Sequence, residues 1–167
     1  MIGWWVTWVG LTTLSATLLA GLLLPATRTG SHEAVLPADP ERVRQTILDV
    51  EAQPRWRREV AAVELGADGR SWVEKTHAGE RIRFEIREHA ENRLVLRFDS
   101  SRGYRGQWLG EWQHAPGGET RLRVLESATV DHPLMRLVAR VAFDPAEFAR
   151  RWTRELESEL ARRAAAG

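Results

Sequence analysis

The stretch from His32 to Val60 reads HEAVLPADPERVRQTILDVEAQPRWRREV, and it contains the signals that decide the fold. An alternating segment typical of a strand ends at Leu36. Asp39 can then accept hydrogen bonds from free backbone amides, and Pro40 suits the first position of a helix. We therefore expect a strand that passes directly into a capped helix.

The rest of this stretch continues the pattern. Val43, Ile47 and Val50 fall on one face of the expected helix. Pro54 ends that helix, and Trp56 follows in a short second helix or turn. A second strand is expected to begin soon after this tryptophan.

Apolar and polar residues alternate through the middle of the chain, which predicts an antiparallel sheet. Residues favouring turns, such as the Pro-Gly-Gly at 116–118, separate the alternating segments. With the strand that ends at Leu36, the sheet should have seven strands, the other six being Glu59–Gly66, Ser71–His77, Arg81–His89, Arg93–Ser100, Tyr104–His114 and Thr120–Asp131. Gly106 and Gly110 lie inside one strand, where glycine usually marks a bulge or a tight bend, and here they should help the sheet to curve.

A long helix is expected at the C-terminal end of the chain. Asp144 and Pro145 form a second cap and helix start. An apolar stripe follows at steps of four residues, made of Phe148, Trp152, Leu156 and Leu160. The apolar segment before it, Pro133–Phe143, is expected to be the first half of the same helix; the alternative is a helix that lies at a membrane interface.

This order of elements resembles the START/polyketide-cyclase-like superfamily, also called SRPBCC or helix-grip proteins. The resemblance rests on the strand ending in Pro-Ala-Asp-Pro-Glu-Arg-Val, the helix ending Ile47-Leu48-Asp49-Val50 and the Pro-x-Trp turn, and it covers residues 32 to 167. It implies an α+β helix-grip fold in which a curved sheet wraps the C-terminal helix. Proteins similar to this one typically hold an apolar ligand between the sheet and that helix.

The N-terminal segment has a different character. Residues Ile2 to Leu24 carry no charge, and a helix of this length could cross a bilayer. Trp4, Trp5 and Trp8 crowd one end, as at a membrane interface. A transmembrane anchor at residues 1–27 is favoured over a cleaved signal peptide, because no positive charge precedes the apolar run. We expect a linker at 28–31 and one domain at 32–167, on a side of the membrane that the flanking charges do not determine.

Composition excludes several classes of function. The formal net charge of +1 does not favour nucleic acid as a partner. The chain has no cysteine, and its five histidines are scattered, so neither a metal site nor a cofactor is predicted. No motif marks a phosphate loop or a nucleophilic serine. Glu74 and Glu126 are the carboxylates expected to face inward, where burial could raise a pKa.

Large aromatic residues are the main candidates for a binding site. They can fill a core or line a cavity, and the family resemblance favours the cavity. We predict that an apolar ligand is lined by Trp56, Trp72, Phe84, Phe98, Trp108, Trp112, Glu126, Phe148 and Trp152.

The function predicted from the sequence is the binding of a hydrophobic small molecule or lipid by a membrane-anchored domain. Two alternatives remain. One is an enzyme of the polyketide cyclase or dehydratase kind, which would need two titratable groups meeting in the cavity. The other is an accessory module of a membrane complex, which a cavity filled by aromatic residues would favour. On the solvent face of the sheet, arginines should exceed the carboxylates Glu85, Asp99 and Glu111. A solvated face with partial cross-strand pairing is expected there, and contact with anionic lipid is the alternative. The arginines predicted on this face are Arg81, Arg83, Arg87, Arg93, Arg97, Arg105, Arg121 and Arg123.

Overall fold

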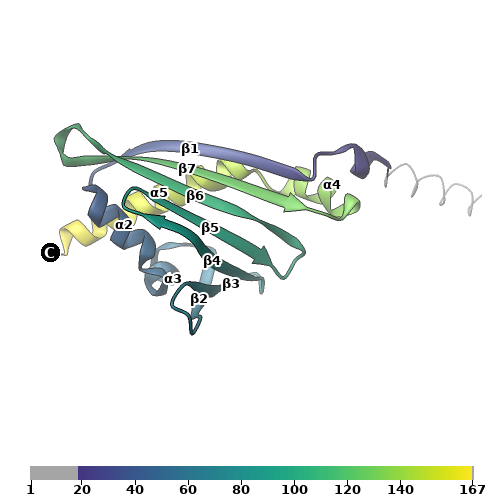
Figure 1. Cartoon of the computed structure of the whole chain (residues 1–167), viewed down its shortest axis with the longest axis horizontal. Coiled ribbons are helices and arrows are strands. Elements are labelled where there is room, and N and C mark those ends of the chain that lie inside the picture. Colours follow the sequence, from purple (N-terminus) through teal and green to yellow (C-terminus); the bar gives the residue numbers. More distant parts are fainter. Residues whose placement is uncertain (1–18, 167) are drawn as a thin grey trace, which may run out of the picture.

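The computed structural model describes residues 19–166 and has one sheet wrapped around a long helix (Figure 1). All seven strands are antiparallel neighbours in the order β1-β7-β6-β5-β4-β3-β2. The strands are β1 (Thr27–Leu36), β2 (Val60–Leu65), β3 (Ser71–Thr76), β4 (Arg81–Ala90), β5 (Arg93–Ser100), β6 (Tyr104–Ala115) and β7 (Glu119–Val130). The α+β helix-grip architecture expected from the sequence is confirmed.

The helices are short except for the last. They are α2 (Pro40–Leu48), η1 (Val50–Ala52), α3 (Gln53–Trp56), η2 (Pro116–Gly118), α4 (Pro133–Ala142) and α5 (Pro145–Ala165). Both predicted caps form: the Asp39 side chain accepts from the amide of Arg42 at 2.9 Å, and Asp144 accepts from the amide of Ala146 at 2.9 Å. These caps satisfy amides that a helix start leaves free, and they fix where α2 and α5 begin.

The first strand is longer than the sequence indicated. β1 begins at Thr27 and pairs with β7 from Thr27 opposite Thr129 onward, so the linker predicted at 28–31 is wrong and those residues are strand. Gly30 is required here because a Cβ atom would lie 2.2 Å from the backbone nitrogen of Ala146. The start of α5 therefore rests directly on the backbone of β1.

The C-terminal helix is not continuous. The segment 133–143 was expected to be its first half, but α4 ends at Ala142 and Phe143 is extended, with φ −137° and ψ 124°. Pro145 cannot donate a backbone hydrogen bond, which helps to separate the two helices. The side chain of Arg28 holds the end of α4 by donating to the carbonyl oxygens of Ala139 and Phe143.

Side chains fill the space between the sheet and α5 at one end only. At the end nearer α2, the fully buried residues include Leu36, Leu122, Leu156 and Leu160, packed with Trp112. The other end, between β3–β7 and α4, encloses a cavity. A filled core and an aromatic cavity, which the sequence offered as alternatives, thus occupy opposite ends of the same layer.

The glycines of β6 serve packing rather than a bulge. β6 pairs with both neighbours in unbroken register, and the shifts occur instead in β4 between Ile86 and Glu88 and in β2 between Val60 and Ala62. A Cβ on Gly106 would lie 2.6 Å from the Phe98 ring. Of the bulge and the tight bend that the sequence offered for these glycines, the bulge does not form in β6.

The solvent face of the sheet is nearly neutral because neighbouring carboxylates pair with its arginines. The ion pairs are Arg81–Glu64, Arg87–Glu85, Arg93–Glu111, Arg97–Asp99, Arg105–Asp131, Arg121–Glu33 and Arg123–Glu111. Of the arginines predicted on this face, only Arg83 forms no ion pair within residues 19–166. The expected excess of positive charge is largely cancelled, which supports cross-strand pairing over a lipid-binding face.

The predicted anchor lies mostly in residues 1–18, which are outside the described part of the chain. Residues 19–23 are helical and lie beside α4, where a Cβ on Gly21 would be 2.3 Å from the carbonyl oxygen of Pro133. Between residues 19 and 166, no helix combines the length and apolar character needed to span a bilayer.

Candidate functional site

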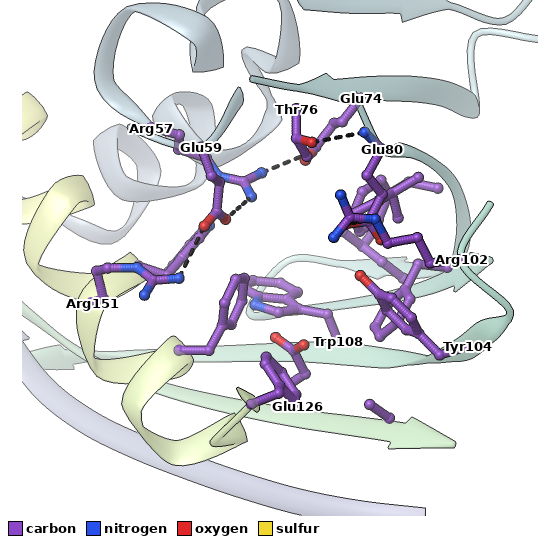
Figure 2. Close-up of a pocket in the computed structure, with 18 of the residues that line it drawn as sticks. Arg57, Glu59, Glu74, Thr76, Glu80, Arg102, Tyr104, Trp108, Glu126 and Arg151 are labelled. Carbon is purple, nitrogen blue, oxygen red and sulfur yellow. Dashed lines mark hydrogen bonds and ion pairs between the residues drawn. The ribbon is translucent and has the colours of Figure 1, made fainter. Parts of the chain in front are cut away.

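A cavity of about 430 Å³ lies between the concave face of the sheet and the helices α4 and α5. This volume falls in the range of pockets that hold small molecules. Its walls are mainly aromatic and aliphatic side chains from β3 to β7. Figure 2 shows that charged and polar side chains enter from both sides of this apolar space.

Most of the predicted site residues meet in this cavity. Of the nine predicted residues, the seven that line it are Trp72, Phe84, Phe98, Trp108, Glu126, Phe148 and Trp152. Trp56 and Trp112 do not. Trp56 packs behind Trp152 with ring centroids 6.0 Å apart, and Trp112 is buried in the filled end, where its indole N–H donates to the carbonyl oxygen of Glu91 at 2.9 Å.

The aromatic walls form two packed groups. Trp72 stacks on Phe84 with ring centroids 5.3 Å apart, and Phe84 lies 5.8 Å from Phe98. Opposite them, Trp108 of β6 packs against Trp152 of α5 at 5.0 Å. Such contacts stabilise ring positions beyond the effect of burial alone, so these walls are held in place before any ligand arrives.

One edge of the cavity carries a buried ion cluster centred on Arg57, which is 6% exposed. Its Nη1 donates to Glu74 Oε1 at 2.8 Å and to Gln53 Oε1 at 2.7 Å, while its Nη2 donates to Glu59 Oε1 at 2.7 Å. Arg151 of α5 reaches the other oxygen of Glu59 at 3.0 Å. The cluster links the α3–β2 turn, β3 and α5, and both of its carboxylates are already held by arginines (Figure 2).

A second polar group lies across the cavity, where Glu80 meets Tyr104 and Arg102 (Figure 2). Glu80 accepts from the hydroxyl of Ser100, and Arg102 lies 3.6 Å from its other oxygen. Burial, together with Glu80, raises the pKa of Tyr104 above its usual range. The phenol is therefore neutral at physiological pH and can donate a hydrogen bond.

Glu126 differs from these carboxylates because, in the described part of the chain, no arginine forms an ion pair with it. It is 6% exposed on β7, directly opposite Trp108 of β6. Burial raises the pKa of Glu126 to about 8; Arg57 opposes this rise, while Glu59 adds to it. At neutral pH the side chain is mainly a protonated carboxylic acid.

Both carboxylates that the sequence predicted to face inward are buried: Glu74 is 1% exposed and Glu126 is 6% exposed. It did not identify Arg57, Glu59 or Arg151, because charged residues near a turn or on a helix usually face water. Strand phase revealed the glutamates, but the position of Arg57 depends on the packing of distant elements. Within residues 19–166, no three His, Asp or Glu residues are grouped so as to hold a metal ion.

Comparison with known proteins agrees with this architecture. The model of the family described as polyketide cyclase / dehydrase and lipid transport matches residues 27–166. The chain belongs to this family. Its members' fold thus covers the whole sheet, the cavity and both C-terminal helices.

Solved structures share the fold at low sequence identity. A START superfamily protein from Mycobacterium smegmatis is 16% identical with a TM-score of 0.64, covering 80% of this chain and 97% of its own. A conserved protein from Geobacillus kaustophilus is 14% identical with a TM-score of 0.67, covering 81% and 96%. A norcoclaurine synthase from Thalictrum is 9% identical with a TM-score of 0.63, covering 83% and 96%. A search of curated proteins found no match.

Proposed function

We propose that the protein binds an apolar small molecule in the cavity and carries it without changing it chemically, while its N-terminal segment holds it at a membrane. The observation that carries this proposal is the cavity of about 430 Å³ with preformed aromatic walls. Burying an apolar ligand there removes apolar surface from water, and each Å² that is buried contributes about 25 cal/mol to the free energy of binding. Membership of a family that includes lipid transport agrees with this function.

The surroundings of α4 support a membrane source for the ligand. Met135 and Val138 line the cavity and are also 44% and 54% exposed. Residues 19–23 pack beside α4 and expose Leu22 and Leu23, which continue the uncharged segment that begins at Ile2. An apolar ligand leaving the bilayer near this segment would meet the apolar edge of the cavity first.

Ligand recovery tests the proposal. The full chain, extracted in mild detergent, should carry an apolar molecule that mass spectrometry identifies. Trp152→Leu should lose it, because Trp152 is a cavity wall. Trp112→Leu is the matched control, since it also removes a buried tryptophan but in the filled core. Loss of the molecule from both variants to the same extent would show that stability, not the cavity, governs retention.

Membrane attachment has its own test. An uncharged segment long enough to span the bilayer should keep the full chain in the membrane pellet through high-salt and alkaline carbonate washes. Release of the protein by either wash would contradict the anchor and leave the cavity proposal standing.

A second candidate function, acid–base catalysis of the cyclase or dehydratase kind, is favoured by one observation. Glu126 is a neutral acid that shares the cavity with the carboxylates of Glu59 and Glu74. Removing a general acid typically lowers turnover by about 10² or more. Isolation of a chemically altered product that disappears in Glu126→Gln or Glu74→Gln would establish catalysis over carriage. The cavity also counts against a non-binding accessory module, for which a filled interior was expected.

A further inference from the structure

Two polar side chains inside the cavity have hydrogen-bonding groups without partners. The indole N–H of Trp108, a residue that is only 4% exposed, is buried and has no acceptor among residues 19–166. Glu126, 6% exposed, forms no hydrogen bond within residues 19–166 through its carboxyl group. The two residues are direct cross-strand neighbours in β6 and β7, so their side chains lie together on the concave face (Figure 2).

Buried polar groups are nearly always hydrogen-bonded, and an unpaired one destabilises the folded state. Among the other polar residues that line the described cavity, the exceptions to that rule are one atom each of Arg57 (Nε) and Glu74 (Oε2), which belong to the ion cluster. Trp72, for comparison, donates its indole N–H to Glu74 at 3.2 Å. Trp108 and Glu126 lie outside that ion cluster and next to each other across two strands, so their unpaired groups indicate a partner that binds there.

We infer that Glu126 and Trp108 form a two-donor site for the carbonyl oxygen of a neutral, otherwise apolar ligand. This inference rests on the proposed binding function. An indole can only donate, and a protonated carboxyl donates through its O–H, so a single acceptor atom between them satisfies both donors at once. A carbonyl oxygen has two lone pairs and can accept both bonds.

The donors and charges around the cavity disfavour an ammonium or an anionic head group. An ammonium group has only donors and would leave the Trp108 indole unpaired. An anionic ligand would need a free cation, but Arg57, Arg102 and Arg151 each pair with a glutamate. Burying an uncompensated charge is strongly unfavourable.

The donor role of Glu126 depends on its protonation. Charged and titratable groups surround it on several elements. On the β1 side, Arg28 and His32 flank Gly30, which lies opposite Glu126. The groups on the other elements are Arg57 and Glu59 before β2, Glu74 on β3, Tyr104 on β6, and Arg151 and Glu155 on α5. Burial holds the pKa of Glu126 at about 8 in this setting. Carbonyl binding should therefore weaken as the pH rises through about 8.

The experiment compares probes of equal chain length on the full chain in mild detergent: a methyl ketone, the parent alkane, the primary amine and the carboxylic acid. Two hydrogen bonds should make the ketone bind at least about tenfold more tightly than the alkane at pH 7. At pH 9 this preference should fall severalfold. The C=O stretch of a bound, isotope-labelled ketone should move to lower frequency, which reports the hydrogen bonds directly.

Three variants separate the contributions. Glu126→Gln keeps a donor, so ketone binding should persist and its pH dependence should vanish. Trp108→Phe should reduce the ketone preference severalfold and diminish the shift of the C=O stretch while keeping the pH dependence. Phe84→Leu, which alters an apolar wall, should weaken ketone and alkane binding alike.

The outcomes distinguish this inference from the proposed function. Equal binding of ketone and alkane, or tightest binding of the amine or the acid, would overturn the two-donor site and leave an apolar carrier. Failure of every probe to bind would instead contradict the proposed function itself.

Discussion

Replacing Glu126 with glutamine should stabilise the protein at neutral and alkaline pH. The substitution keeps the shape of the side chain and removes its ability to ionise. Burial raises the pKa of Glu126 from 4.5 to about 8 in the folded state, against the opposing effect of Arg57. Because this carboxyl binds its proton more tightly when folded, ionisation destabilises the wild-type protein progressively from about pH 4.5 to about pH 8, and the effect is constant above that.

The size of the effect follows from the shift. Each pKa unit corresponds to about 1.4 kcal/mol, so the whole change from 4.5 to about 8 corresponds to at most about 5 kcal/mol. We expect Glu126→Gln to be more stable than wild type by about 3 kcal/mol at pH 8 and equal to it at or below pH 4.5. For a chain of this size, about 3 kcal/mol raises the melting temperature by roughly 6–12 °C.

Thermal unfolding of the full chain in mild detergent, followed by circular dichroism from pH 4.5 to 9, measures this difference. Glu85→Gln is the control, because Glu85 is an exposed carboxylate, 46% accessible, that pairs with Arg87 on the solvent face. Its substitution should change stability by less than about 1 kcal/mol throughout. Parallel pH profiles for wild type and Glu126→Gln would refute the argument that this carboxyl is buried and neutral.

Three further predictions concern stability and boundaries, each measured by thermal unfolding. Arg57→Met should destabilise the fold by about 3–5 kcal/mol because it leaves the buried Glu74 uncompensated, and adding Glu74→Gln should recover part of that loss; additive effects would contradict the ion cluster. Gly30→Val should lower the melting temperature far more than Ser31→Val, which places the same side chain at the neighbouring, exposed position of β1, because a Cβ at Gly30 would lie 2.2 Å from the backbone nitrogen of Ala146; equal losses would mean that α5 does not rest on β1. Deleting residues 1–18 should leave a folded domain, whereas deleting residues 1–30 should not, because the longer deletion removes the start of β1. A cooperative unfolding transition after the longer deletion would instead mean that the folded domain begins at His32.

Local patterns predicted most of the fold. Alternation located the six later strands to within about a residue, and the Asp-Pro pairs at 39–40 and 144–145 marked two helix starts. These signals succeed because caps and strand faces depend on neighbouring residues. The start of β1 was missed because Thr27–Ser31 has the composition of a linker, and its strand structure depends on pairing with β7, about a hundred residues later in the chain.

The candidate site was only half predictable for the same reason. Aromatic residues on one strand face indicated the walls, and seven of the nine predicted residues line the cavity. Trp112 could not be separated from them, since it lies on the same face of β6 as Trp108 and differs only in which end of α5 covers it. The Arg57 cluster joins a turn, a strand and a helix, and nothing in the local sequence distinguishes it from a solvated group.

The arrangement of charges is the strongest physical reason to favour carriage over catalysis. Acid–base chemistry needs an acid and a base that both reach the ligand. Glu126 supplies a neutral acid, but Glu59 is held by both Arg57 and Arg151, and one oxygen of Glu74 accepts from Arg57 and from Trp72. Both carboxylates are thus already engaged by arginine or indole donors, and a ligand would have to displace these contacts before either could accept a proton from it. The cavity therefore offers hydrogen bonds to a ligand more readily than it offers a site for removing a proton from one.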